Sequence, residues 1–251
     1  MSSKLEFKYE NKAYLYLILL PIFVLFVWVF NLFGNEIITY LMLILTCLLL
    51  GKKDINKYFS LIDNSLLQTL SLGLILYFLE ISITGLGLGM MDYVFGVNDP
   101  QGTSGIHFET TFEYSKAIIH LPFIAIGEEF VKVLIFLGIL STTSSLSLWR
   151  RVVIAVAVSS LIFGFFHAFS WKLTSIFPIA LSAIPGYLFL IYFRSIIPLI
   201  FSHFIFDGIA FTMHSSLNTI TLVIFFISIF VFSTIIGIYF YIRDNIISSD
   251  S

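Results

Sequence analysis

The chain has 251 residues, of which 59% are hydrophobic and only 11% are charged, and its mean hydropathy is +1.01. Soluble domains carry about 25% charged residues, so this composition excludes a water-soluble globule. A net charge of −2 with so much apolar content also excludes a disordered chain and gives no general attraction to nucleic acid. The composition therefore predicts an all-α membrane protein with several spans.

Eight stretches are candidates for membrane-crossing helices, which need about 20 mainly apolar residues. In chain order they are 14–33, 37–51, 66–89, 117–140, 152–171, 174–193, 196–213 and 219–242. The second stretch is short for a span and the third is long. We expect a helical bundle with about eight transmembrane helices that forms one integral-membrane domain over residues 1–251.

The cations between these stretches predict the orientation, because cytoplasmic segments are enriched in Lys and Arg. With both termini in the cytoplasm, ten cations lie inside and two outside. The inside set is Lys4, Lys8, Lys12, Lys52, Lys53, Lys57, Arg150, Arg151, Arg194 and Arg243, and the outside set is Lys116 and Lys172. This asymmetry favours an even number of spans in a multi-pass protein, which we expect in the plasma membrane.

The long connection 90–116 falls on the outside in this topology. It contains turn-forming glycines and the Asp99-Pro100 pair, followed by His107, Glu109 and Glu113 between aromatic residues. This pattern predicts an interfacial loop or a short amphipathic helix, and a lid over a substrate is the alternative.

The fourth stretch carries Glu128, Glu129 and Lys132 near its middle. Three charges at the centre of a span cost roughly 7–10 kcal/mol on the insertion scale, and its apolar residues return roughly 5–9 kcal/mol. Glu128 and Lys132 are four residues apart, in the favourable order for a helical ion pair. A second carboxyl group beside one ammonium is typical of general acid–base catalysis, and an ion pair that only locks helices together is the alternative.

Two other stretches add ionisable residues at membrane depth. The fifth contains Phe163-Gly164-Phe165-Phe166-His167, and the seventh contains His203 and Asp207, which share a helix face. Each pattern alone is compatible with ordinary packing. Because intramembrane ionisable groups usually face the bundle interior, we expect the three stretches to converge on one site. His167 lies roughly 10 Å outward of the centre of its span, so convergence requires the fifth helix to be shifted, tilted or broken near Gly164.

The ordered motifs resemble those of the CAAX-protease and bacteriocin-processing (CPBP, or Abi) intramembrane peptidases. That family carries Glu-Glu-x-x-x-Arg, Phe-x-x-x-His and His-x-x-x-Asn/Asp on successive core helices of an eight-span bundle, and the resemblance here covers about 117–213. One position departs from the pattern: Val133 stands where the family has Arg, and Lys132 precedes it. A Lys in this place is similar to the PrsW-type branch of intramembrane proteases.

The resemblance implies an intramembrane endopeptidase that hydrolyses a peptide bond of a membrane-associated protein or peptide. Glu128 with His167 would hold and deprotonate the attacking water, and His203 with Asp207 would stabilise the tetrahedral intermediate. From residue chemistry alone, an ionised Asp207 cannot donate to an oxyanion as Asn could, so it is better suited to orient His203.

Glu129 belongs to the expected catalytic set, and Lys132 and Phe163 are its supporting residues. Two His and one Glu can also form a three-ligand zinc site, but no His-Glu-x-x-His segment is present. The resemblance favours a glutamic peptidase without a cofactor, with zinc as the alternative, and the expected partners are the substrate and the lipid bilayer. Glu80 and His120 also lie at membrane depth and are left outside the expected site.

Two further interpretations belong to other functional classes. A proton-coupled transporter would use Glu128, Glu129 and His203 as a relay, although the sequence has no internal repeat of the kind many transporters have. A catalytically silent protein, for example one that confers bacteriocin immunity, would not need Glu128 to be ionisable.

Overall fold

The computed structural model describes residue 7 and residues 9–10, 12–30, 36–96, 107–171, 173–215 and 219–249. Regular structure within these ranges is helical, apart from one isolated bridge between Phe108 and Ser215, so the expected all-α class is confirmed. The α-helices are α1 (Tyr16–Phe30), α2 (Glu36–Tyr58), α3 (Leu66–Phe95), α4 (Thr111–Thr142), α5 (Leu148–Trp171), α6 (Ile176–Phe193), α7 (Ile197–Met213) and α8 (Thr219–Ser249). Short 3₁₀ turns are η2 (Ala13–Leu15), η3 (Ile62–Asn64) and η5 (Leu173–Ser175).

Helix α4 is the centre of the bundle. It packs against α1, α2, α5, α7 and α8, and every residue from 129 to 140 is buried. A helix that is apolar on all sides is stable when other elements surround it, which explains this position. Glu128, Glu129 and Lys132 of α4 therefore lie in the interior of the bundle.

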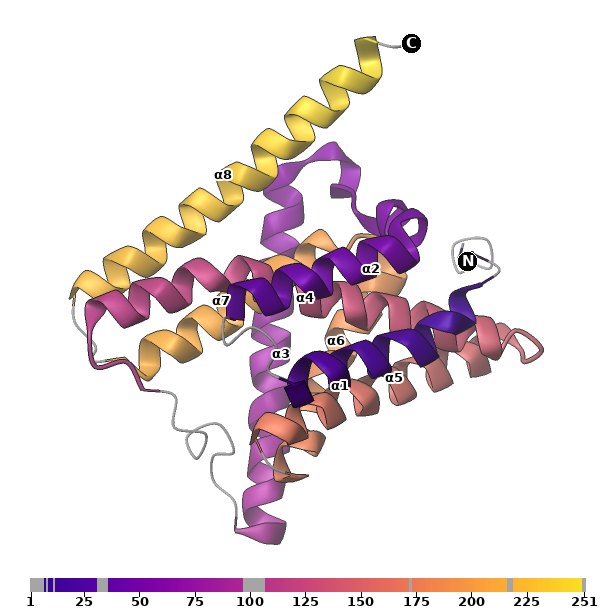
Figure 1. Ribbon diagram of the computed structural model, residues 1–251, viewed down its shortest axis with the longest axis horizontal. Helices are drawn as coiled ribbons and strands as arrows, with labels where there is room; N and C mark the ends of the chain where they lie inside the picture. Colours follow the sequence, from indigo (N-terminus) through magenta and orange to yellow (C-terminus); the bar gives the residue numbers. More distant parts are fainter. Residues whose placement is uncertain are drawn as a thin grey trace.

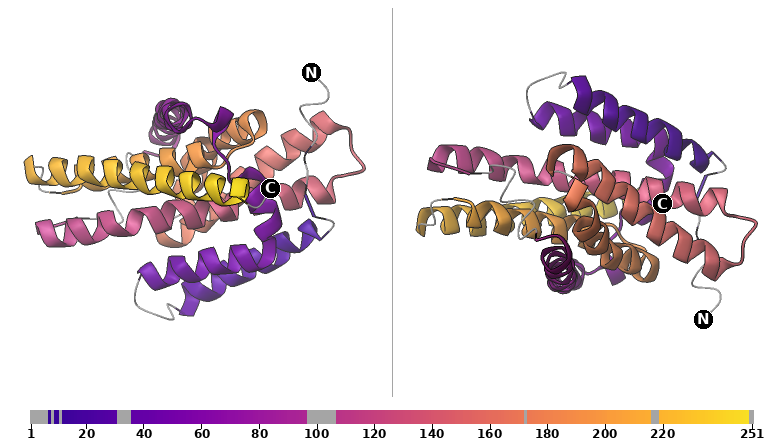
Figure 2. Two further views of the ribbon diagram at one scale, coloured as in Figure 1. Left: turned by 90° about the horizontal axis from the view of Figure 1, so that it is seen from above. Right: turned by 90° about the horizontal axis from the view of Figure 1, so that it is seen from below.

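Helix α3 crosses the other helices steeply. It is upright in Figure 1 while α4 and α5 run across the picture, and it is seen nearly end-on in both views of Figure 2. It packs against α6 and α7. At Gly73 an added Cβ would lie 2.9 Å from the Pro198 carbonyl oxygen, so the absence of a side chain permits the close crossing.

The helix ends gather on two opposite faces. On one face α3, α5 and α7 end and α4, α6 and α8 begin; we call it the Phe108 face, because the Phe108 N–H donates there to the His214 carbonyl at 3.2 Å. The opposite face, named here the Arg194 face, holds the ends of α2, α4, α6 and α8. The Phe108 face is at the lower left of Figure 1 and the Arg194 face is at the upper right.

The protein is an integral membrane protein. Four segments within the described ranges are long and apolar enough to cross a membrane, namely Leu66–Phe95, Leu148–Ala168, Leu173–Phe193 and Thr219–Asn245. Ala13–Leu25 and Ile197–Met213 are shorter apolar helices. Within the described residues each of the eight expected stretches contains a helix, and four segments meet the length and apolarity of a span on their own.

Two expected boundaries are wrong. Helix α2 continues beyond residue 51 to Tyr58, across a break in helical geometry at Gly51 (φ −136°, ψ 26°). The connection expected over 90–116 is shorter than predicted, because α3 continues to Phe95 and α4 begins at Thr111. Thr110 and Glu113 form a capping box that starts α4, so Glu113 belongs to a helix terminus and not to a loop. Residues 97–106, including Asp99-Pro100, lie outside the described residues.

A polar cluster ties the N-terminal segment to α2 at the Arg194 face. Asp54 is fully buried, and its carboxylate accepts from the Glu10 backbone N–H at 3.1 Å, from the Tyr16 hydroxyl at 2.9 Å and from the Lys57 ammonium at 2.7 Å. Both of its oxygens have at least two donors. This carboxylate is therefore completely satisfied by the protein.

Candidate active site

The two adjacent glutamates of α4 have different partners. Glu129 is 1% exposed at its side chain and forms a buried ion pair with Lys132, one turn along the helix. Glu128 points to a different side, where the Tyr40 hydroxyl of α2 donates to its Oε1 at 3.0 Å. The expected Glu128–Lys132 pair is therefore replaced by a Glu129–Lys132 pair, which leaves Glu128 without a cationic partner on its own helix.

The second carboxylate oxygen of Glu128 faces two imidazole rings. Its Oε2 lies 3.6 Å from Nε2 of His167 and 3.6 Å from Nε2 of His203. Both distances exceed the range of direct hydrogen bonds, and this buried oxygen has no hydrogen-bond partner among the described residues. A water molecule beside the three atoms can bridge polar groups at such a separation.

His167 is fixed by its own helix. Its Nδ1 lies 3.0 Å from the Phe163 carbonyl oxygen, which can only accept, so Nδ1 carries the hydrogen and the lone pair of the neutral ring is at Nε2. The Phe163 ring also lies under the Lys132 ammonium, 4.6 Å from its centroid. Phe163 thus connects the position of His167 to that of the buried ion pair.

His203 is held between carboxylates from two helices. Its Nδ1 donates to Oε1 of Glu129 at 2.8 Å, and its Nε2 lies 3.3 Å from Oδ2 of Asp207, one turn along α7. These contacts set the plane of the ring and direct Nε2 towards Glu128. The structure thus brings all five residues of the expected catalytic set together.

Helix α5 reaches the site without a break. It is continuous through Gly164, where the absence of a side chain allows the Ile176 carbonyl of α6 to approach its backbone. His167 reaches Glu128, with its Nε2 3.6 Å from Oε2, although it lies near the end of α5.

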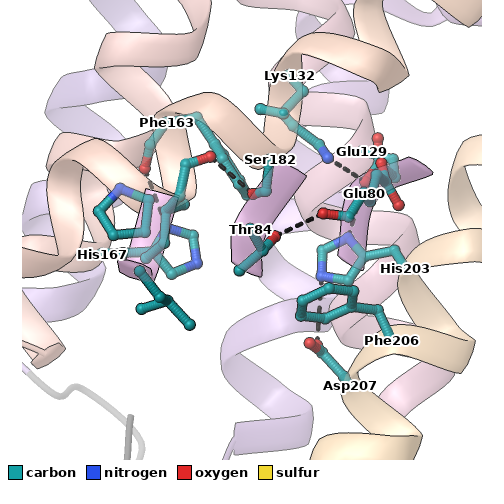
Figure 3. A pocket seen from close by; sticks show the side chains of 14 residues that line it. Glu80, Thr84, Glu129, Lys132, Phe163, His167, Ser182, His203, Phe206 and Asp207 are labelled. Atoms are coloured by element: carbon teal, nitrogen blue, oxygen red, sulfur yellow. Dashed lines mark hydrogen bonds and ion pairs between the residues drawn. The ribbon is translucent and has the colours of Figure 1, made fainter. Parts of the chain in front are cut away.

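A pocket of about 740 Å³, counting its open part, lies beside the imidazoles of His167 and His203, and Glu128 is not among its lining residues (Figure 3). Its polar lining includes Glu129, Lys132, His167, His203 and Asp207, and apolar side chains from α3, α5, α6 and α7 form the other walls. The latter are Leu88, Phe163, Pro178, Ile179, Ala183 and Phe206. A few polar groups among mainly apolar lining residues are typical of a ligand-binding pocket.

Two contributors lie outside the expected site. Tyr40 binds Glu128 from α2, and Glu80 of α3 lines the pocket and accepts from the Ser202 hydroxyl. Ser202 directly precedes His203, so this contact joins α3 to the part of α7 that carries the imidazole. His120 is buried on α4 and does not line the pocket.

The side chains fit a zinc site poorly. Each ring nitrogen of His203 already faces a carboxylate oxygen, at 2.8 Å and 3.3 Å. Within the described part of the chain, no group of three or more His, Cys, Asp or Glu side chains could hold a metal ion.

Residues 111–209 match the family of type II CAAX prenyl endopeptidases called Rce1-like, so the resemblance to the CAAX proteases is confirmed over this segment. The match supports an intramembrane endopeptidase in general. Comparison with curated proteins and with solved structures found no match.

Proposed function

We propose that the protein is an intramembrane endopeptidase that hydrolyses a peptide bond of a membrane protein or peptide by a water molecule that Glu128 activates. One observation carries this proposal: Oε2 of Glu128 is buried, lacks a hydrogen-bond partner among the described residues and lies 3.6 Å from Nε2 of both His167 and His203. Buried polar groups are usually hydrogen-bonded, so an unsatisfied one at this point favours a ligand.

A water molecule suits the space between Glu128 and His167. The carboxylate oxygen and the Nε2 lone pair are both acceptors, so they cannot bond to each other when the ring is neutral. One water can donate a hydrogen to each of them, which directs its oxygen lone pairs away from both. Its oxygen then bonds to the substrate carbonyl carbon as its proton passes to Glu128.

His203 is suited to stabilise the oxyanion that forms in this step. When the ring is protonated, its Nε2–H lies between Oδ2 of Asp207 at 3.3 Å and Oε2 of Glu128 at 3.6 Å, and it can turn from these long contacts to an oxyanion while Glu129 holds the ring through Nδ1. When the carbon–nitrogen bond breaks, the proton on Glu128 passes to the leaving amine. Glu128 is then ionised again, and the products are an acid and an amine.

We propose that this reaction needs no metal or other cofactor. Protein carboxylates already occupy both sides of His203, and Lys132 provides the fixed positive charge of the site. The name of the matched family refers to CAAX prenyl substrates. For this chain we propose the broader class, a protein or peptide in the plasma membrane, because the pocket combines polar groups with apolar walls suited to an extended peptide.

The decisive experiment compares wild type with Glu128→Gln in cells and in proteoliposomes. We expect the variant to lose cleavage by about 10²–10⁴-fold, the usual contribution of a general base, while its melting temperature in detergent stays the same. Proteomics of membrane-peptide fragments supplies the readout. Glu109→Gln, an exposed residue before α4, is the matched control and should cleave normally.

Two results would contradict the proposal. An unchanged fragment pattern in Glu128→Gln would favour a catalytically silent binding protein, and proton flux into liposomes without any peptide product would favour a transporter. Cleavage abolished by a zinc chelator and restored by zinc would contradict the cofactor-free mechanism.

A further inference from the structure

The pocket has a closed end and an open end. Its buried end is formed by Glu80, Lys132 and Ala183, which are 8%, 6% and 3% exposed. On α3 the half-buried lining residues Thr84 and Leu88 lie one and two turns beyond the buried Glu80, and on α7 Asp207 lies one turn beyond His203. Exposure therefore rises along α3 towards one side of the molecule, and on α7 it rises from 13% at the His203 side chain to 21% at that of Asp207.

That side is the Phe108 face. On α3 the lining advances from Glu80 to Leu88, towards the C-terminal end at Phe95, and on α5 it advances from Phe163 to His167, near the end of the helix. On α6 the lining residues lie in the first half, which begins at the same face. The lining residues of all these helices therefore lie towards the helix ends that meet at the Phe108 face.

The cations identify the side of the membrane to which the Phe108 face belongs. Among the described residues, one cation, Lys116, lies on this face. Eight lie on the Arg194 face, namely Lys12, Lys52, Lys53, Lys57, Arg150, Arg151, Arg194 and Arg243. Lys132 is within the bundle, and Lys4, Lys8 and Lys172 are outside the described residues. Because Lys and Arg are enriched on the cytoplasmic side, the Phe108 face is the extracytoplasmic one.

We infer that the pocket opens to the extracytoplasmic side of the membrane and takes its substrate from there. This inference rests on the proposed peptidase function for the identity of the substrate, but the sidedness of the opening can be measured without any cleavage. The substrate class narrows to proteins or peptides whose scissile bond lies in the outer half of the bilayer or just outside it. A bond on the cytoplasmic side would lie beyond the closed end of the pocket.

The single cysteine makes a direct test available. Cys47 is fully buried, so Cys47→Ala gives a background without thiols, into which one cysteine at a time is introduced. Thr84→Cys on α3 and Ser182→Cys on α6 report on the pocket from two helices, so that one remains informative if the other fails to fold. A charged, membrane-impermeant maleimide is applied to intact cells and to inside-out vesicles.

Three control positions calibrate the labelling. Lys116→Cys and Lys53→Cys mark the two faces, and Leu79→Cys lies on α3 with a lipid-facing side chain that is 44% exposed. We expect the pocket cysteines and Lys116→Cys to react in intact cells, Lys53→Cys to react only in inside-out vesicles, and Leu79→Cys to react in neither.

Labelling of the pocket cysteines only from the side of Lys53→Cys would overturn the inference, and so would the absence of labelling from both sides. Cleavage is scored separately, with a reporter whose target segment is placed outside or inside the membrane. Outside labelling with no cleavage of either reporter would contradict the peptidase function and leave the sidedness of the opening established.

Discussion

Two buried carboxylates in this protein differ in how completely the chain satisfies them. Asp54, at the Arg194 face, receives donors on both oxygens from a backbone N–H, a hydroxyl and an ammonium. Glu128, in the centre of the bundle, receives the Tyr40 hydroxyl on one oxygen, and its other oxygen faces two imidazoles beyond hydrogen-bond distance. Both groups are expensive to bury, but only Asp54 is fully compensated by the protein itself.

The difference separates a structural role from a chemical one. A carboxylate whose two oxygens both have hydrogen-bond donors from the protein holds chain segments together and has no position left for a ligand. A buried carboxylate with one oxygen that lacks a donor lowers the stability of the protein unless a ligand binds to it. Buried groups of this kind are expected at functional sites. The comparison predicts that Asp54 variants lose stability while Glu128 variants lose activity.

The largest loss of stability is expected for Lys132→Met, which removes the cation of the buried Glu129–Lys132 ion pair. Glu129 would then be a buried carboxylate without its cation, so the free energy of unfolding should fall by about 3–5 kcal/mol. Thermal or denaturant unfolding in detergent measures this loss. The double variant Glu129→Gln/Lys132→Met removes both charges and should recover most of it; equal stability of the two variants would show that the pair is not coupled.

A smaller effect on stability is expected for Asp54→Asn. The substitution removes the charge that accepts from Lys57 and Tyr16, and hydrogen bonds to charged groups contribute about 1.5–3 kcal/mol. The rate of cleavage per folded molecule should not change, because Asp54 lies far from the pocket lining. A variant that melts normally but cleaves slowly would break the comparison between the two carboxylates.

The smallest effect, a modest loss of cleavage activity, is expected for Tyr40→Phe. This variant removes the one hydroxyl that holds Glu128, a contact of about 0.5–1.5 kcal/mol, so kcat/KM should fall by about 2–10-fold. The matched control is Tyr93→Phe, at a side chain that is 93% exposed. A loss as large as that of Glu128→Gln would instead make Tyr40 part of the reacting groups.

The sequence predicted the presence of every helix but not where several of them end. Hydropathy detects apolar residues, so it does not include the polar continuation of α2 to Tyr58 or the capped first turn of α4 at Thr111. Because that first turn is exposed and carries Glu113, its helical structure depends on the capping box, a local signal that a search for apolar stretches does not use.

The motif residues of the site were predictable because their spacing places them on defined helix faces. Tyr40 and the Glu80–Ser202 contact could not be predicted in this way. A single polar residue on another helix forms no pattern of regularly spaced residues in the sequence. The sequence also placed both Glu128 and Glu129 beside Lys132 without deciding which of them pairs with it. Both glutamates are within one turn of it, and the choice between them depends on which side of α4 faces His203.

The contact at Gly164 sets the distance between helices α5 and α6, and side-chain rearrangement cannot change it. Backbone meets backbone there, with the Ile176 carbonyl against α5 and the amide nitrogen of Ala180 3.2 Å from where a Cβ would be. Phe163 of α5 and Ile179 of α6 both line the pocket. The residue at position 164 thus limits how far apart α5 and α6 lie. A methyl group added there would push the two helices apart, and substrates with bulkier side chains should then fit into the pocket.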